Sequence, residues 1–158
     1  MVDYELLKKQ AIELAGGCEW YITLCANISA LLYESLDDVN WVGFYFLRDG
    51  ALFLGPFQGK TACMKIDVGK GVCGTSVKES RIICVDDVHL FKGHIACDSA
   101  SEAEIVFPIH YDDRIIGVLD IDSPKKFRFS KDDEAGLLQI VQVIEDRLGF
   151  IGKYDEKK

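Results

Sequence analysis

Residues 41–57 read WVGFYFLRDGALFLGPF. Two apolar runs, WVGFYFL at 41–47 and ALFLGPF at 51–57, flank the dipeptide Asp49-Gly50. Asp-Gly between two such runs is a strong hairpin signal, because both residues tolerate the positive φ of a tight turn. The stretch therefore predicts an antiparallel β-hairpin at the start of a β-rich middle of the chain.

Further strands are predicted at residues 82–85 (IICV), 104–109 (EIVFPI) and 114–122 (RIIGVLDID). Each run is short, apolar and rich in β-branched residues, which is typical of strands. The polar turn YDDR joins the last two strands, and we expect them to pair as a second hairpin.

Helices are predicted at both ends of the chain. Apolar residues recur at helical spacing over residues 3–15 and 18–35. Residues 130–148 begin with Ser130 as N-cap and with acids in the first turn, which is typical of a helix start. Strands and helices do not alternate regularly, which disfavours a doubly wound parallel sheet. The order predicts an α+β fold, in which the N- and C-terminal helices pack on one side of an antiparallel central sheet.

The composition predicts one domain and excludes several classes of partner. The chain has 158 residues with no repeat or linker, so we expect residues 1–158 to form a single domain. It divides into N-terminal helices at about 3–35, a sheet with active-site loops at about 40–122, and a C-terminal helix at about 130–149. Acidic residues outnumber basic ones by 26 to 18, which makes nucleic acid or an anionic membrane an unexpected partner. No signal peptide or spanning segment is present, so we expect a cytoplasmic protein.

The cysteines divide into two groups of three. A reducing cytosol disfavours a disulfide framework, and no CxxC pair indicates a zinc ribbon or a thioredoxin-type motif. The first group is predicted to be small apolar core residues: Cys18, Cys25 and Cys84. The second group lies in loop-like or glycine-flanked segments, where function concentrates: Cys63, Cys73 and Cys97. Acidic neighbours of Cys97 are expected to raise the pKa of its thiol.

A set of acids is predicted on one face of the sheet. Asp120 and Asp122 alternate with apolar residues and so point the same way, and Glu104 opens the strand expected to pair with theirs. Such a cluster fits recognition of a small cation, and mutual repulsion can keep one acid protonated as a general acid. The alternative is a solvated polar face. Trp41 is either an aromatic wall for a methyl or cationic group or an ordinary core or rim tryptophan.

Two other kinds of site have partial support in the sequence. GPFQGKT at 55–61 resembles a phosphate loop, but three residues instead of four precede Gly-Lys-Thr, so we reject it. A metal site would draw on these residues: His89, His94, Cys97 and Asp98. No second ligand pair stands at a recognisable zinc spacing, so we expect no metal. His110 is predicted to be a solvated strand-end residue.

Five motifs together carry a family resemblance. They are NWVGFYFL (40–47), GPFQGKTAC (55–63), IDVGKGVCGTS (66–76), DVHLFKGHIACDSASEAEIV (87–106) and GVLDIDS (117–123). In these motifs the chain resembles the free methionine-(R)-sulfoxide reductases, which have a GAF-domain fold. The resemblance implies a thiol-dependent enzyme without a cofactor and with thioredoxin as electron donor. It also implies a homodimer, for which the N-terminal helices offer apolar surface.

The resemblance also implies roles for single residues. Cys97 would attack the sulfoxide and become a sulfenic acid, and Cys63 would then close a disulfide, with Cys73 as an additional or alternative partner. The family's substrate-binding and catalytic acids match Glu104, Asp120 and Asp122. Its aromatic residue near the substrate methyl matches Trp41. Two alternatives stay open: a non-catalytic GAF-type sensor of a small molecule, and a metal-binding protein that uses Cys97 and His94.

Overall fold

The computed structural model of the chain describes residues 1–93 and 100–151. In this part of the chain, six strands form one antiparallel sheet in the order β3-β2-β1-β6-β5-β4. The strands are β1 (Trp41–Arg48), β2 (Ala51–Gly59), β3 (Lys65–Asp67), β4 (Ile83–Val85), β5 (Ala103–Tyr111) and β6 (Arg114–Ser123). The helices are α1 (Tyr4–Gly16), α2 (Tyr21–Ser35), α3 (Gly71–Glu79) and α4 (Lys131–Ile151), with a short 3₁₀ turn η1 (Val88–Leu90).

Both predicted hairpins are confirmed. Arg48 pairs with Ala51 across Asp49-Gly50, whose φ values are 50° and 78°. Tyr111 pairs with Arg114 across Asp112-Asp113, with φ values of 50° and 59°. Two consecutive residues with positive φ match the right-handed twist of the flanking strands. The turns therefore set the register of the two strand pairs from which the sheet is built.

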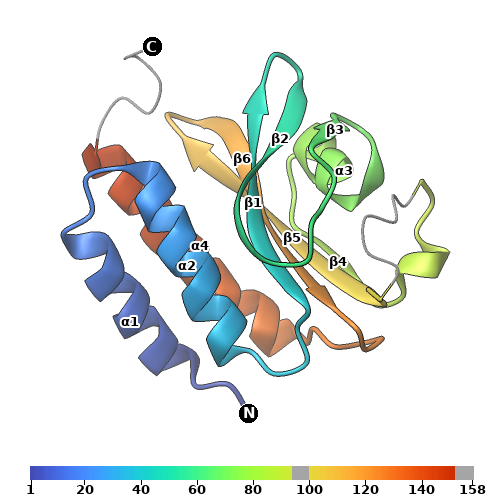
Figure 1. The fold of residues 1–158 in the computed structure, drawn as a ribbon, viewed down its shortest axis with the longest axis horizontal. Coiled ribbons are helices and arrows are strands. Elements are labelled where there is room, and N and C mark those ends of the chain that lie inside the picture. The colour runs from blue at the N-terminus through green and yellow to red at the C-terminus, as the bar shows by residue number, and fades with distance from the viewer. Residues whose placement is uncertain (94–99, 152–158) are drawn as a thin grey trace.

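The N- and C-terminal helices cover one face of the sheet, as predicted. Figure 1 shows α1, α2 and α4 together on that face, with α3 on the other. Buried residues of α2 and α4 meet those of β1, β5 and β6 in one large apolar core. The start of α4 is a capping box: Asp133 N–H donates to Ser130 Oγ (3.1 Å), and Ser130 N–H donates to Asp133 Oδ2 (2.9 Å).

A second core lies on the opposite face, under α3. It joins buried residues of the sheet and of α3, among them Trp41, Tyr45, Val72 and Val118. The sequence did not predict α3, because GKGVCGTS contains glycines that weaken helix propensity. Gly74 is required by packing, since a Cβ there would lie 2.4 Å from the Asp67 carbonyl oxygen. Burial against the sheet thus overrides a weak local preference.

The predictions for single residues met different outcomes. Cys18 and Cys25 are buried, as expected, and His110 is exposed with Nδ1 3.0 Å from Glu145 Oε2. The prediction that Cys84 belongs to the core is wrong, because Cys84 is exposed. It lies on the edge strand β4, whose buried side chains are those on either side of it.

The surface bears on partners in two ways. None of the described helices is long and apolar enough to cross a membrane. Leu6, Ile12 and Trp20 are exposed apolar side chains on or next to α1. No described segment of the chain covers these side chains. They are the kind of surface that a second copy could bury, and the homodimer stays a prediction.

Candidate active site

Strand register brings the predicted acids together on the face that α3 covers. Glu104 of β5 lies opposite Asp122 of β6, and Asp122 lies opposite Trp41 of β1. One step along β6, Asp120 faces Gly43 of β1. Directly paired residues point to the same side of a sheet, so these side chains form one site. The expectation that Glu104 lies near the two aspartates is confirmed.

Burial changes the acid chemistry of this group. Glu104 is 8% and Asp120 6% exposed. Burial and the charge of Asp120 raise the pKa of Glu104 well above its usual value. Burial and the charge of Asp122 likewise raise the pKa of Asp120. The alternative of a solvated polar face is therefore wrong for these two acids, and the group can hold a proton near neutral pH.

Asp120 has a buried oxygen without a protein donor among the described residues. Among the described residues, no group donates a hydrogen bond to Oδ1 of Asp120, although this atom is buried. A buried carboxylate oxygen without a donor is costly and is characteristic of a site that binds something else. An ammonium group would supply both the hydrogen bond and the opposite charge.

Cys73 contacts the same acids from α3. The glycine-flanked segment predicted around Cys73 is the first turn of this helix and not a loop, and the residue is 3% exposed. Its Sγ is 3.9 Å from Glu104 Oε2. Burial, then the charges of Asp120 and Glu104, raise the pKa of the thiol. Cys73 is therefore a protonated thiol that can donate to a carboxylate, and a poor nucleophile.

An aromatic stack forms the wall beside the acids. The Trp41 indole is 2% exposed and stacks on Phe57 (ring centroids 5.3 Å apart) and on Tyr45 (5.9 Å). A Cβ at Gly43 would lie 2.5 Å from the Trp41 ring, so only glycine leaves room for it. Trp41 is thus a buried tryptophan at the edge of the acid group. Its burial confirms the expected packing role, and its role as a wall for a substrate methyl or cationic group stays a prediction.

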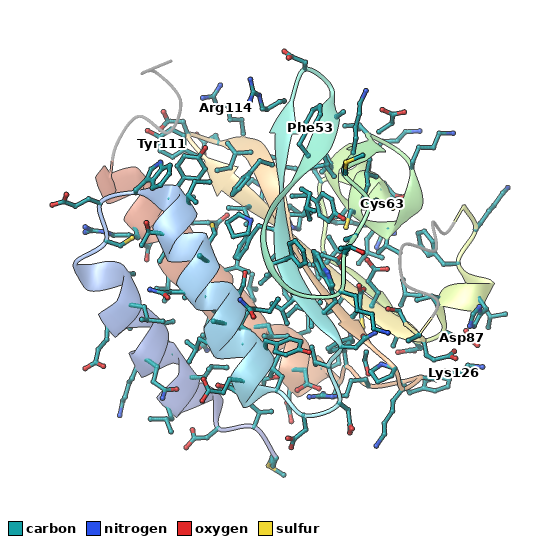
Figure 2. All side chains as sticks on the ribbon, viewed as in Figure 1. Phe53, Cys63, Asp87, Tyr111, Arg114 and Lys126 are labelled. Carbon is teal, nitrogen blue, oxygen red and sulfur yellow. The ribbon has the colours of Figure 1, made fainter. Side chains whose placement is uncertain are left out.

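Cys63 lies between β2 and β3 and is half-buried. It is disulfide-bonded, whereas the four free cysteines among the described residues are Cys18, Cys25, Cys73 and Cys84. Figure 2 shows Cys63 on the side of the molecule that carries α3. The Tyr45 hydroxyl donates to the Cys63 carbonyl oxygen at 3.0 Å. The predicted site residue Cys97 lies outside the described residues.

Within residues 1–93 and 100–151, two clusters have the ligand types for a metal. The donor atoms of Cys73, Glu104 and Asp120 lie within 4.8 Å of one another, and so do those of Asp87, His89 and Glu102. In the second cluster, Lys126 Nζ is 3.1 Å from Asp87 Oδ2 and already supplies positive charge (Figure 2). The other ligands of the metal hypothesis, His94, Cys97 and Asp98, lie outside the described residues.

Comparison with known proteins places this chain in a family. A model described as the GAF domain matches residues 21–148. The free methionine-R-sulfoxide reductase of Escherichia coli K12 is 52% identical over 142 residues, which cover 90% of this chain and 86% of the relative. The chain belongs to the GAF-domain family of free methionine-R-sulfoxide reductases.

Solved structures of this GAF-domain family share the whole fold. The fRMsr of Staphylococcus aureus in its reduced form superposes with a TM-score of 0.92 at 55% identity, over 94% of this chain and 96% of that chain. A putative GAF sensor protein from Burkholderia vietnamiensis superposes with a TM-score of 0.90 at 46% identity, over 94% of each chain.

Sequence reasoning missed two residues of this GAF-domain site. Tyr45 and Phe57 complete the aromatic stack, and Tyr45 contacts the Cys63 backbone. The signal for Tyr45 was present, because Trp41, Gly43 and Tyr45 alternate along one strand and so share one face. The hydrogen bond to Cys63 could not be foreseen, because it depends on the path of the chain after β2.

Proposed function

We propose that this chain reduces free methionine-R-sulfoxide to methionine with cysteine thiols, without a bound cofactor. The observation that carries the proposal is the buried pair of Glu104 and Asp120 beside the Trp41 ring, in which burial and neighbouring negative charge raise the pKa of both carboxyls. Relatives and solved structures that match most of the chain bear the name of this activity. One solved relative, the Staphylococcus aureus fRMsr, is a complex with its substrate.

The acids would bind and activate the substrate. An ammonium group beside buried carboxylates gains a charge-assisted hydrogen bond, and the bare Oδ1 of Asp120 can accept it. A sulfoxide sulfur becomes electrophilic when its oxygen is protonated. A carboxyl with a raised pKa, Glu104 or Asp120, can donate that proton near neutral pH. Asp122 faces Glu104 across the strand pair and adds negative charge for the ammonium.

The thiols would carry the electrons. In the first step the S–O bond of the sulfoxide breaks, oxygen passes to the sulfur of Cys97, and the carboxyl proton completes a sulfenic acid as methionine leaves. In the second step the sulfur of Cys63 attacks the sulfenic sulfur, so that an S–S bond forms and water leaves. Two thiols thus supply the two electrons that the sulfoxide consumes. Thioredoxin, a dithiol, would reduce the disulfide again.

Two observations favour Cys63 over Cys73 as the resolving thiol. Cys63 is half-buried and disulfide-bonded in the structure, while Cys73 is free. Cys73 is also deeply buried with a raised pKa, which lowers its nucleophilicity. Its place beside Glu104 fits a hydrogen-bond donor to the acid group.

The decisive experiment separates the first turnover from cycling. Fully reduced protein is given R or S isomers of methionine sulfoxide, and NADPH consumption is followed with thioredoxin and thioredoxin reductase. Cys97→Ser is expected to form no methionine. Cys63→Ser is expected to form one methionine per enzyme and then stop, and exposed Cys84→Ser serves as the matched control with full cycling. Absence of R-specific turnover in the reduced wild type would refute the proposal.

A non-catalytic sensor is the second candidate, favoured by the putative GAF sensor protein that shares this fold at 46% identity. It would use the same acids and aromatic stack to bind a small cation. Calorimetric titration with methionine sulfoxide, combined with thiol counting before and after, distinguishes the two. Binding with no loss of thiols favours the sensor, and loss of two thiols per methionine favours the reductase.

A further inference from the structure

We infer that Tyr45 is a positioning residue for the disulfide-forming step, because its hydroxyl fixes the backbone that carries Cys63. The inference rests on the proposed function, in which Cys63 closes the disulfide. It assigns to the aromatic stack a second task besides forming a wall of the site.

The segment 60–63 is held to β1 at two points. The Tyr45 hydroxyl donates to the Cys63 carbonyl oxygen at 3.0 Å, and Trp41 Nε1–H donates to the Lys60 carbonyl oxygen at 3.0 Å. The carbonyl of Met64 is fixed as well, since it accepts from the N–H of Leu54 at 3.1 Å. With three backbone carbonyls held, we expect the position of Cys63 Sγ in the reduced protein, in which the disulfide is open, to depend mainly on rotation of its own side chain.

The two donors are themselves immobile. Tyr45 and Trp41 are each 2% exposed, and their rings stack at 5.9 Å with an angle of 28°. Phe57 stacks on the far side of Trp41 at 5.3 Å. Burial, then the charges of Asp120 and Cys73, raise the pKa of Tyr45, so its hydroxyl keeps its proton. The anchors therefore hold at every pH at which the protein would work.

A fixed Cys63 speeds closure because reacting groups that are already in place lose little further entropy. The same rings that form the wall of the site thereby set the position of the resolving thiol. Removal of the Tyr45 hydroxyl leaves the ring stack intact but releases the Cys63 end of the segment. We expect the closing step to slow by about tenfold, the size of effect that the loss of a well-placed hydrogen bond produces.

The test compares two rates in reduced wild type and in Tyr45→Phe after one equivalent of methionine-R-sulfoxide is added. Methionine formation reports the first step, and decay of the sulfenic acid, trapped with dimedone at timed intervals, reports closure. Tyr45→Phe is expected to keep the dimedone-reactive species about tenfold longer than wild type, timed from the moment the sulfenic acid has formed so that any change in the first step does not affect the result. Tyr33→Phe, at an exposed tyrosine of α2, is the matched control and is expected to change neither rate.

Trp41→Phe releases the Lys60 anchor in a second variant. Closure is timed after the sulfenic acid has formed, so weaker substrate binding in this variant does not affect the result. Slower closure in both variants supports the inference. Closure at the wild-type rate in Tyr45→Phe overturns it while leaving the reductase intact, and failure of reduced wild type to form methionine refutes the proposed function instead. If Tyr45→Phe does not fold, closure at the wild-type rate in Trp41→Phe overturns the inference.

Discussion

Gly43→Ala tests whether the aromatic wall is set by the missing side chain at this position. A Cβ at residue 43 would lie 2.4 Å from Phe57 Cβ and 2.5 Å from Trp41 Cη2. The Phe57 Cβ is attached to the backbone of the neighbouring strand, so relief of that clash needs a shift between β1 and β2. The indole must in addition move by about 1 Å to reach ordinary contact at about 3.5 Å. Overpacking of this kind costs about 1–3 kcal/mol.

Displacement of the indole weakens two further interactions that contribute to the free energy of unfolding. Its stacking on Tyr45 and Phe57 is worth about 0.5–1.5 kcal/mol per ring pair, and its hydrogen bond to the Lys60 carbonyl about 1 kcal/mol. Because the ring shifts without leaving the core, we expect only part of these terms to be lost. The expected fall in the free energy of unfolding is about 2–4 kcal/mol.

Urea unfolding at fixed pH measures this change, and fluorescence of Trp41 in a Trp20→Phe background reports the indole environment. Gly16→Ala is the matched control, because a Cβ there meets nothing within 4 Å. We also expect the KM for methionine-R-sulfoxide to rise in Gly43→Ala, since the wall moves. A Gly43→Ala protein within about 0.5 kcal/mol of wild type, with unchanged Trp41 fluorescence, would show that the reasoning is wrong.

Three further predictions follow from the charges and caps. Asp120→Asn is expected to change the pH dependence of stability. Because the pKa of Asp120 is raised in the folded state, its carboxyl group contributes stability that is fully present below the unfolded-state pKa. This contribution is lost as pH rises through the folded-state pKa. Urea unfolding from pH 4 to 9 should therefore show a smaller loss of stability with rising pH in Asp120→Asn than in wild type, and parallel curves would contradict the assignment. Ser130→Ala removes the N-cap of α4 and should lower the free energy of unfolding by about 1 kcal/mol at pH 7. Ser35→Ala, at the last residue of α2 and away from any helix start, is its control. Equal falls in the free energy of unfolding in the two variants would argue against the cap. Cys84 is exposed, but burial of its sulfur and the charge of Asp86 raise its pKa to about 11. Mass spectrometry after iodoacetamide treatment should show slow labelling at Cys84 near pH 7 that accelerates toward pH 11, and pH-independent labelling would exclude the raised pKa.

Local sequence signals predicted the frame of this protein. The two hairpins could be predicted from Asp49-Gly50 and Asp112-Asp113, because a two-residue turn with positive φ is a local property of the chain. Period-two alternation placed Asp120 and Asp122 on one face, and strand pairing then accounted for Glu104 beside them. The Ser130 cap was likewise visible, since its partner Asp133 is only one helical turn away.

Long-range packing decided what the sequence alone could not. α3 forms although its glycines disfavour a helix, because its apolar side is buried against the sheet, and it brings Cys73 within 3.9 Å of Glu104. The exposure of Cys84 depends on β4 being an edge strand, a fact of strand order that no local pattern carries. The raised pKa values of Glu104 and Asp120 require both burial and contact between two strands. The sequence therefore determined which side chains could share one face of the sheet. The tertiary structure determined which of these side chains are buried, because burial depends on the segments that cover them.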